Sequence, residues 1–301
     1  MKKTIAIAGG TGLVGNSLSK ELQVKGHEVR ILTRKENVQP PFYHWNPAAK
    51  KIDEAALKNV QVIINLSGAG IADKKWTDKR KKEIEESRIF PTWFLYELSE
   101  NLPALTQYIS ASGITCYGFD NSEKLFTEKD EFGKDYISQV VREWEKAADL
   151  FSSHQKVAKI RTGVVLTENG GALPKISKTV KYFVGAPLGT GKQIMPWISL
   201  KDIVKLYVYA VEKELDGAFN AVADNVSNAE LTNAIAKQLH RPLWLPKVPK
   251  FALKLVLGEL STMVLEGVHV SNQKIKDTGF QFEHPNIESA LKYIYEVEGK
   301  K

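Results

Sequence analysis

The chain has 301 residues with an ordinary globular composition, 43% hydrophobic and 26% charged, so it resembles neither a disordered nor a repetitive chain. Its one cysteine, Cys116, excludes an intramolecular disulfide and favours a reducing compartment. The net charge of +7 admits nucleic acid, an anionic membrane or an anionic small ligand as partners. No stretch approaches the roughly 18 apolar residues of a membrane-spanning helix. We therefore expect a cytoplasmic protein without a membrane partner.

Strands alternate with helices through the first two thirds of the chain. The apolar run at 4–8 predicts a buried strand that ends in glycines. The next expected elements are a helix at 14–25, strands at 29–33 and 60–66, a helix at about 78–99, a strand at 108–112, a helix at 136–151 and a strand at 157–161. This alternation predicts an α/β fold with a doubly wound parallel sheet of the Rossmann type. Ligands of such sheets bind at the carboxyl ends of the strands.

After residue 166 the pattern changes. Residues 167–198 are rich in glycine and proline and predict a loop-rich excursion. A helix at about 200–213 and a strand at 218–222 follow, and helical segments dominate from 225 onward. The predicted domains are therefore a Rossmann domain, 1–168 with 199–224, and a smaller, mostly helical substrate-side lobe, 169–198 with 225–301. A cleft between two such lobes is a common place for a small-molecule substrate.

A glycine-rich loop follows the first predicted strand and opens the first predicted helix. Its glycines permit a tight turn and a close approach of backbone to a pyrophosphate, while the helix N-terminus supplies N–H donors and partial positive charge. The alternative is a glycine-rich turn without a ligand. We expect cofactor contacts from Gly9, Thr11, Gly12, Leu13, Val14 and Gly15.

The end of the second predicted strand indicates which dinucleotide binds. NAD enzymes usually place an Asp or Glu there, where it holds the ribose 2′-hydroxyl. This chain has Arg34 and Lys35 instead, and Arg34 lies nineteen residues after Gly15. A guanidinium attracts a 2′-phosphate that a carboxylate would repel. The sequence therefore favours NADP(H) over NAD(H), the alternative for Arg34 being a solvated loop residue.

The densest basic run, residues 74–82, leads into acidic residues along the same predicted helix. An ion-paired, solvated helix face explains this order of charges without a ligand. No nucleic-acid-binding motif accompanies the run. We expect no nucleic-acid partner.

Further motifs stand in order along the whole chain. They are Asn65-Leu66-Ser67-Gly68-Ala69-Gly70-Ile71, Trp76-Thr77 with Arg80-Lys81, Ser87-Arg88-Ile89, Ser110-Ala111-Ser112, Tyr117-Gly118, Thr127-Glu128, Trp144-Glu145, Arg161-Thr162-Gly163-Val164-Val165-Leu166, Pro196-Trp197-Ile198 with Asp202, and Gly279-Phe280. With the glycines at 9, 12 and 15, the chain resembles the extended and atypical branches of the short-chain dehydrogenase/reductase superfamily. It is most similar there to NADP-binding, nucleoside-diphosphate-sugar epimerase-like proteins that carry a small C-terminal domain.

The resemblance implies further cofactor contacts, at Leu66, Ser67, Gly68, Glu83, Arg88, Ser110 and Gly163. For Arg88 the alternative is a surface salt bridge with nearby acidic residues. Many proteins of this superfamily pair through the helices expected here at 78–99 and 136–151. A homodimer is therefore left open.

The catalytic residues are harder to predict. Hydride-transferring relatives use a Tyr with a Lys four residues later, and the Lys lowers the pKa of the tyrosine. The candidate Tyr136 is followed at that position by Val140, so this proton relay is incomplete. The candidates for proton transfer are Ser112, Tyr117, Glu128 and Tyr136, although Glu128 is also interpretable as a turn carboxylate and Tyr117 as a structural hydroxyl. The six histidines lack metal-ligand spacing, so we expect no metal.

Two functions compete. The first is an NADP(H)-dependent oxidoreductase or epimerase-like enzyme acting on an unidentified small molecule, with a sugar-like compound as one option. The second is a non-catalytic NADP(H)-binding redox sensor or regulatory protein, which the missing lysine favours.

Overall fold

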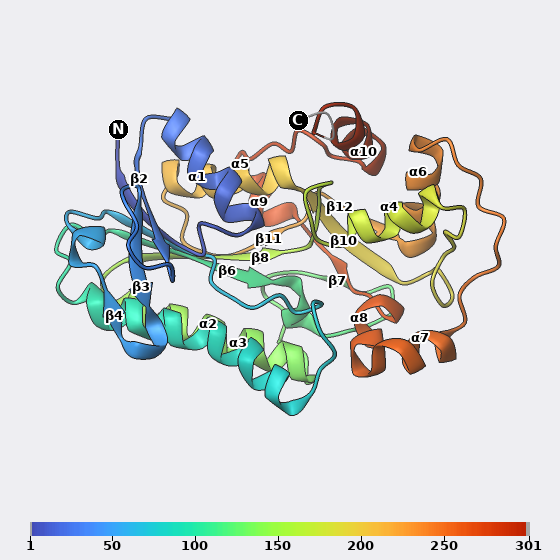
Figure 1. Ribbon diagram of the computed structural model, residues 1–301, viewed down its shortest axis with the longest axis horizontal. Coiled ribbons are helices and arrows are strands. Elements are labelled where there is room, and N and C mark those ends of the chain that lie inside the picture. Colours follow the sequence, from blue (N-terminus) through green and yellow to red (C-terminus); the bar gives the residue numbers. More distant parts are fainter. Residues whose placement is uncertain (1, 299–301) are drawn as a thin grey trace.

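A sheet of eight strands forms the centre of the structure, a computed structural model that describes residues 2–298 (Figure 1). The strands of these residues are β1 (Thr4–Ala8), β2 (Glu28–Thr33), β3 (Phe42–Asn46), β4 (Lys51–Ile52), β5 (Val62–Asn65), β6 (Gln107–Gly113), β7 (Leu125–Phe126), β8 (Lys156–Thr162), β9 (Val164–Leu166), β10 (Ile194–Ser199), β11 (Gly217–Ala221), β12 (Asp224–Ser227) and β13 (His269–Val270). The large sheet has the order β11-β8-β6-β5-β1-β2-β3-β4. All its neighbours are parallel except β3 and β4.

Helices cover both faces of this sheet (Figure 1). The α-helices of the described residues are α1 (Leu13–Val24), α2 (Asp78–Ser99), α3 (Tyr136–Asp149), α4 (Leu173–Lys181), α5 (Leu200–Glu212), α6 (Asn228–Gln238), α7 (Lys250–Leu257), α8 (Thr262–Leu265), α9 (Gln273–Asp277) and α10 (Ile287–Glu296). Helices α1 and α5 pack together on one face, and α2 and α3 pack together on the other. Because both faces are covered, Ile5 and Ile7 of β1 and Ile63 of β5 are fully buried.

A smaller unit lies beyond the carboxyl ends of the central strands. Its sheet has three strands in the order β12-β10-β9, and α4, α6, α7 and α8 lie around it (Figure 1). One hydrophobic core nevertheless joins it to the large sheet, since a single buried cluster contains Ile7, Trp197 and Leu231. The domain boundaries proposed from the sequence stay a prediction.

The predicted α/β, doubly wound sheet is confirmed, as are the helices and strands expected at its centre. The loop-rich interpretation of 167–198 is wrong in part, because this segment contains α4 and most of β10. Leu173, Ser177 and Val180 make one buried stripe along α4, which the surrounding glycines obscured. Within residues 2–298 no helix is long and apolar enough to cross a membrane.

Candidate functional site

Several of the predicted site residues lie along the edge of the large sheet at which its parallel strands end. Arg34 follows β2, the glycine loop follows β1, Leu66 follows β5, and Ser112 lies at the end of β6. These strands are consecutive neighbours in the sheet, and β8 is next in line. Four inter-strand steps of about 4.8 Å give a distance of about 19 Å from β2 to β8. The edge is thus an elongated surface, as an extended dinucleotide requires.

The glycine loop is a cradle that side chains would fill. Gly9 has φ +75°, and a Cβ there would lie 2.7 Å from the backbone of Leu66. A Cβ on Gly15 would lie 2.3 Å from the Gly9 carbonyl oxygen. Helix α1 starts at Leu13 with Gly12 as its N-cap, which has no side chain to occupy the first N–H groups. These amides are left to bind an anion.

Arg34 and Lys35 are both exposed directly after β2. Their side chains form no ion pair or hydrogen bond with any of residues 2–298. Two cationic groups therefore stand unpaired beside the glycine loop. No carboxylate takes the position that would bind a ribose 2′-hydroxyl.

Arg88 is a buried cation on α2, with 7% of its surface exposed. Its guanidinium donates to the carbonyl oxygens of Ile84, at 2.8 Å, and Ala69, at 3.0 Å, and lies 5.3 Å from the ring centre of Trp144. Burial lowers the pKa of Arg88 to about 10. The surface salt bridge left open by the sequence does not form among the described residues, so the charge is available to a ligand.

Two other residues suggested by the resemblance have partners within the protein. Glu83 is exposed and pairs with Arg80 at 2.7 Å. Ser110 is buried and donates to the Ala111 carbonyl oxygen at 2.9 Å. Their roles at the cofactor stay predictions.

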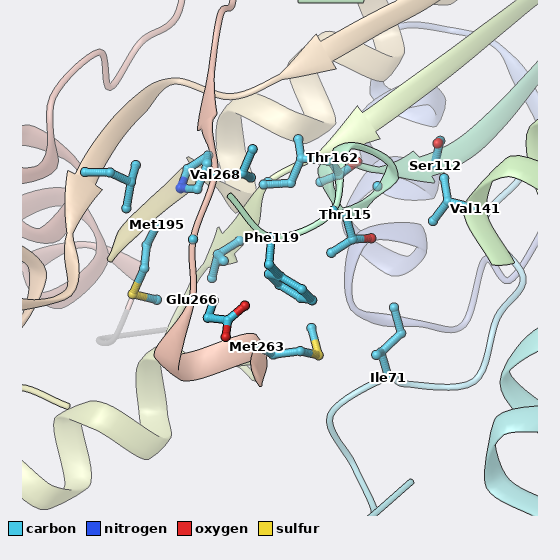
Figure 2. Close-up of a pocket in the computed structure, with 18 of the residues that line it drawn as sticks. Ile71, Ser112, Thr115, Phe119, Val141, Thr162, Met195, Met263, Glu266 and Val268 are labelled. Atoms are coloured by element: carbon cyan, nitrogen blue, oxygen red, sulfur yellow. The ribbon is translucent and has the colours of Figure 1, made fainter. Parts of the chain in front are cut away.

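A cavity of about 310 Å³ lies where β6 and β8 end and β10 begins (Figure 2). Most of its wall is apolar, and Figure 2 shows Ile71, Thr115, Phe119 and Met263 around this space. Its lining residues are Ile71, Arg88, Ser112, Gly113, Ile114, Thr115, Gly118, Phe119, Val141, Trp144, Thr162, Gly163, Val164, Ile194, Met195, Pro196, Met263, Glu266, Gly267 and Val268. Arg88, Ser112 and Gly163 are thus the sequence-predicted residues that meet in this cavity.

Ser112 is tied to a buried ion pair behind the cavity wall. Its hydroxyl donates to Oε1 of Glu145 at 2.6 Å. Arg161 donates to both oxygens of the same carboxylate, at 2.8 and 2.9 Å. Burial opposes the charge of Arg161, but the hydrogen bonds and the charge of Glu145 hold its pKa above the ordinary value. Because its proton points to Glu145, Ser112 can present its lone pairs to the cavity.

Tyr117 and Glu128 belong to the far side of the same network. The Tyr117 hydroxyl accepts from Arg161 at 3.0 Å and donates to Oδ1 of Asn220 at 2.7 Å. The backbone N–H of Asn220 donates to Glu128 at 2.7 Å. Burial raises the pKa of Tyr117. Neither Tyr117 nor Glu128 lines the cavity, so their catalytic assignment stays a prediction without a cavity contact behind it.

Tyr136 opens α3 and also lies outside the cavity. Its hydroxyl donates to the Lys81 carbonyl oxygen at 2.8 Å, and its ring packs edge-on against Trp76. It lines a separate pocket between α2 and α3, together with Val140. Burial raises the pKa of Tyr136 to about 12. The tyrosine therefore has neither the position nor the lowered pKa that a proton relay at the cavity needs.

Thr115, at the cavity, and Glu145 and Arg161, behind it, are polar residues that the sequence did not single out as site residues. A signal existed for Glu145, because it lies among apolar residues on the buried stripe of α3, where a carboxylate needs a buried cation. Thr115 gave no such signal.

Other sequence expectations concern reactive groups. Cys116 is buried, and burial raises the pKa of its thiol. Within residues 2–298 no group of three or more His, Cys, Asp or Glu side chains is arranged to hold a metal ion.

Comparison with known families gives two matches along the chain. Residues 5–221 match the NAD dependent epimerase/dehydratase family, and residues 248–294 match a domain of unknown function, DUF1731. The chain is 37% identical over 302 residues to "Epimerase family protein SDR39U1 homolog, chloroplastic" of Arabidopsis thaliana, covering 97% of this chain and 86% of the relative.

Solved structures give the same result. Human epimerase family protein SDR39U1 (isoform 2), crystallised with NADPH, superposes with a TM-score of 0.89 at 28% identity, covering 98% of this chain and 99% of the human one. A nucleoside-diphosphate sugar epimerase of Corynebacterium glutamicum has a TM-score of 0.81 at 32% identity, covering 98% of this chain and 58% of the other. UDP-glucose 4-epimerase of Thermotoga maritima, at 15% identity and a TM-score of 0.79, shares the fold.

Proposed function

Since the chain belongs to the NAD-dependent epimerase/dehydratase family, we propose that it binds NADP(H) and acts on a small molecule as an oxidoreductase or epimerase-like enzyme. The observation that carries this proposal is that the site residues form one continuous row along the carboxyl ends of the strands. Unpaired Arg34, the glycine cradle and Ser112 follow one another along it and end at the cavity.

The residues present fit the phosphorylated dinucleotide. The amides at the start of α1 would hold the pyrophosphate, and Gly9 and Gly15 leave the space it needs. Arg34 and Lys35 would hold the 2′-phosphate. The human relative crystallised with NADPH is 28% identical over nearly the whole chain, which supports the same choice here.

NADP(H), when bound, supplies or accepts a hydride. The protein must then handle a proton on the substrate oxygen, and Ser112 is the predicted catalytic residue best placed to do so. In the direction of substrate oxidation, the substrate hydroxyl proton passes to Oγ of Ser112 as the Ser112 proton moves to Glu145. Arg161 fixes the Glu145 carboxylate, so this path is oriented in advance. The Thr115 hydroxyl is a second group that can hold the substrate oxygen.

The cavity also limits the substrate. Arg88 is the cationic side chain of its wall, and two backbone carbonyls already share its guanidinium. A mostly apolar space of about 310 Å³ favours a small substrate with few polar groups. A sugar-like ring would have to satisfy its hydroxyls on Ser112, Thr115 and Glu266.

A redox sensor or regulatory protein is the second candidate. It is favoured by Val140 in place of the expected lysine and by the engagement of the Tyr136 hydroxyl with the Lys81 carbonyl. In this case NADP(H) would bind without turnover.

Calorimetric titration with NADPH and NADH tests the proposal. We expect tight NADPH binding that weakens about tenfold or more in Arg34→Ala, as the loss of a charge-assisted contact implies, with little change for NADH. Lys20→Ala, an exposed cation on α1, is the matched control. Failure of both nucleotides to bind would overturn both candidate functions. NADPH oxidation by added carbonyl compounds would support the enzyme, whereas binding without any turnover would support the sensor.

A further inference from the structure

One side of helix α7 is not covered by any other part of residues 2–298. None of its eight residues is buried, and the exposed fractions of Phe251, Leu255 and Val256 are 75%, 82% and 63%. So short a helix does not persist in water by backbone hydrogen bonding alone, and packing of an apolar face is the usual source of its stability. The apolar side of α7 therefore calls for an external partner.

The segment before α7 extends this exposed surface. Trp244 is 67% exposed, and residues 241–249 run along the same end of the molecule from α6 to α7 (Figure 1). The guanidinium of Arg241 lies 5.0 Å from the ring centre of Phe183, which is also exposed. We define the α7 face as Arg241, Trp244, Lys247, Lys250, Phe251, Lys254, Leu255 and Val256.

The charge of the α7 face has one sign. Residues 241–258 contain four basic residues and no Asp or Glu. The first acid that follows, Glu259, is paired with Lys81 of α2. Lys250 and Lys254 are one turn apart and beside the stripe of Phe251 and Leu255, and neither forms an ion pair within residues 2–298.

Exposed apolar side chains beside unpaired basic ones fit some classes of partner better than others. A second copy would meet the α7 face with the same face in a two-fold contact, which brings the basic residues together. Nucleic acid would neutralise the lysines but leave the apolar side chains in water. A bilayer with anionic headgroups matches both, because apolar side chains enter the acyl boundary, lysines meet the headgroups, and tryptophan prefers the interface.

We propose that the α7 face docks the protein peripherally on an anionic lipid surface. The expectation of no membrane partner rested on the lack of a spanning helix, and surface docking needs none. The proposal does not depend on the enzymatic one. It has one spatial consequence, since α7 leads through Gly258–Ser261 to Met263 and Glu266 of the cavity wall. Docking would place that wall near the lipid.

Co-sedimentation of the full chain with vesicles tests the proposal. We expect binding to phosphatidylcholine vesicles that contain phosphatidylglycerol, weak binding to phosphatidylcholine alone, and release by salt. The double variant Phe251→Ser/Leu255→Ser should bind about tenfold more weakly or worse, because two side chains no longer enter the apolar layer. Lys250→Gln/Lys254→Gln should bind more weakly to anionic vesicles only. Val24→Ser is the matched control, since Val24 is as exposed as Leu255, at 82%.

Circular dichroism and thermal unfolding confirm that each variant is folded before it is compared. Absence of binding to anionic vesicles by the unmodified chain would overturn the proposal. So would equal binding of the Phe251→Ser/Leu255→Ser variant, or equal binding to neutral vesicles. Sedimentation velocity detects a second copy, and self-association that this variant abolishes, without vesicle binding, would assign the α7 face to a dimer instead.

Discussion

The Ser112 hydroxyl donates a 2.6 Å hydrogen bond to Glu145, and both residues are buried, with Ser112 on the cavity wall and Glu145 behind it. This contact links the end of β6 to the middle of α3. Relatives with a tyrosine–lysine pair take their proton-transfer group from that helix, but here Tyr136 lies in another pocket. The hydroxyl that we propose for proton transfer therefore comes from a strand end, and α3 supplies its hydrogen-bond acceptor.

Replacement of Ser112 by alanine tests its part in proton transfer. We expect Ser112→Ala to lower turnover by about 10² or more, the usual contribution of a positioned acid or base, without changing the affinity for NADPH. Thr115→Val, which removes another hydroxyl of the cavity wall, should have a smaller effect. Steady-state oxidation of NADPH with a substrate found by screening gives the measurement. The opposite ranking of the two variants would assign the proton-transfer role to Thr115.

The Glu145–Arg161 pair should matter for stability. Glu145→Gln leaves the guanidinium of Arg161 buried with a weaker partner, and the loss of one member of a buried pair costs about 3 kcal/mol. Urea unfolding at neutral pH measures the change. Glu143→Gln is the control, because Glu143 lies on the same helix but is exposed and, within residues 2–298, is paired only with Lys146. Equal stability of the two variants would show that the buried pair contributes nothing.

The positions of several site residues at the carboxyl ends of the strands can be predicted from the local sequence. The glycine loop and Arg34 come directly after strands whose apolar residues are recognisable, and Ser112 lies at the end of another. Parallel strands bring their carboxyl ends to one edge. These positions were therefore predictable without knowledge of the packing. The same holds for the missing lysine at Val140.

The rest depends on contacts between distant segments. Glu145 and Arg161 lie on different elements, and only the packing of α3 against β8 places them at 2.8 Å. The cavity wall joins Thr162 to residues 263–268, which no local pattern connects. The direction of the Tyr136 side chain is likewise set by Trp76, sixty residues earlier. The sequence motifs contain Trp76, Glu145 and Arg161, but they do not predict these contacts.

Acid should weaken the surface ion pairs that Glu214 forms with Lys3 and Lys156. Hydrogen bonds from Lys156 and Lys3 lower the pKa of Glu214 from 4.5 to about 2. A carboxyl group whose pKa is lower in the folded than in the unfolded protein stabilises the fold at any pH above its unfolded pKa. This contribution is lost as the pH falls from about 5 towards 2. Solvent screens the half-exposed group, so we expect Glu214→Gln to cost less than about 1 kcal/mol at pH 7. Urea midpoints of the two proteins should converge towards pH 2, and a constant difference would contradict the assignment.

Two alanine substitutions in the glycine loop separate folding from cofactor binding. A Cβ on Gly15 would lie 2.6 Å from Cα of Gly10 as well as 2.3 Å from the Gly9 oxygen, so Gly15→Ala must displace the backbone. We expect a loss of thermal stability and of NADPH binding together. A Cβ on Gly12 meets only the Gly9 oxygen, at 3.3 Å, and its φ of −76° suits alanine.

Gly12→Ala should therefore keep its melting temperature but bind NADPH about tenfold or more weakly, because the added methyl group projects where the pyrophosphate would approach the start of α1. Differential scanning fluorimetry without ligand and calorimetric titration with NADPH give the two readouts. Unchanged affinity in a folded Gly12→Ala protein would mean that the phosphate does not approach the helix at this point. The stability of Gly15→Ala alone would then reflect packing of the loop and carry no information about the cofactor.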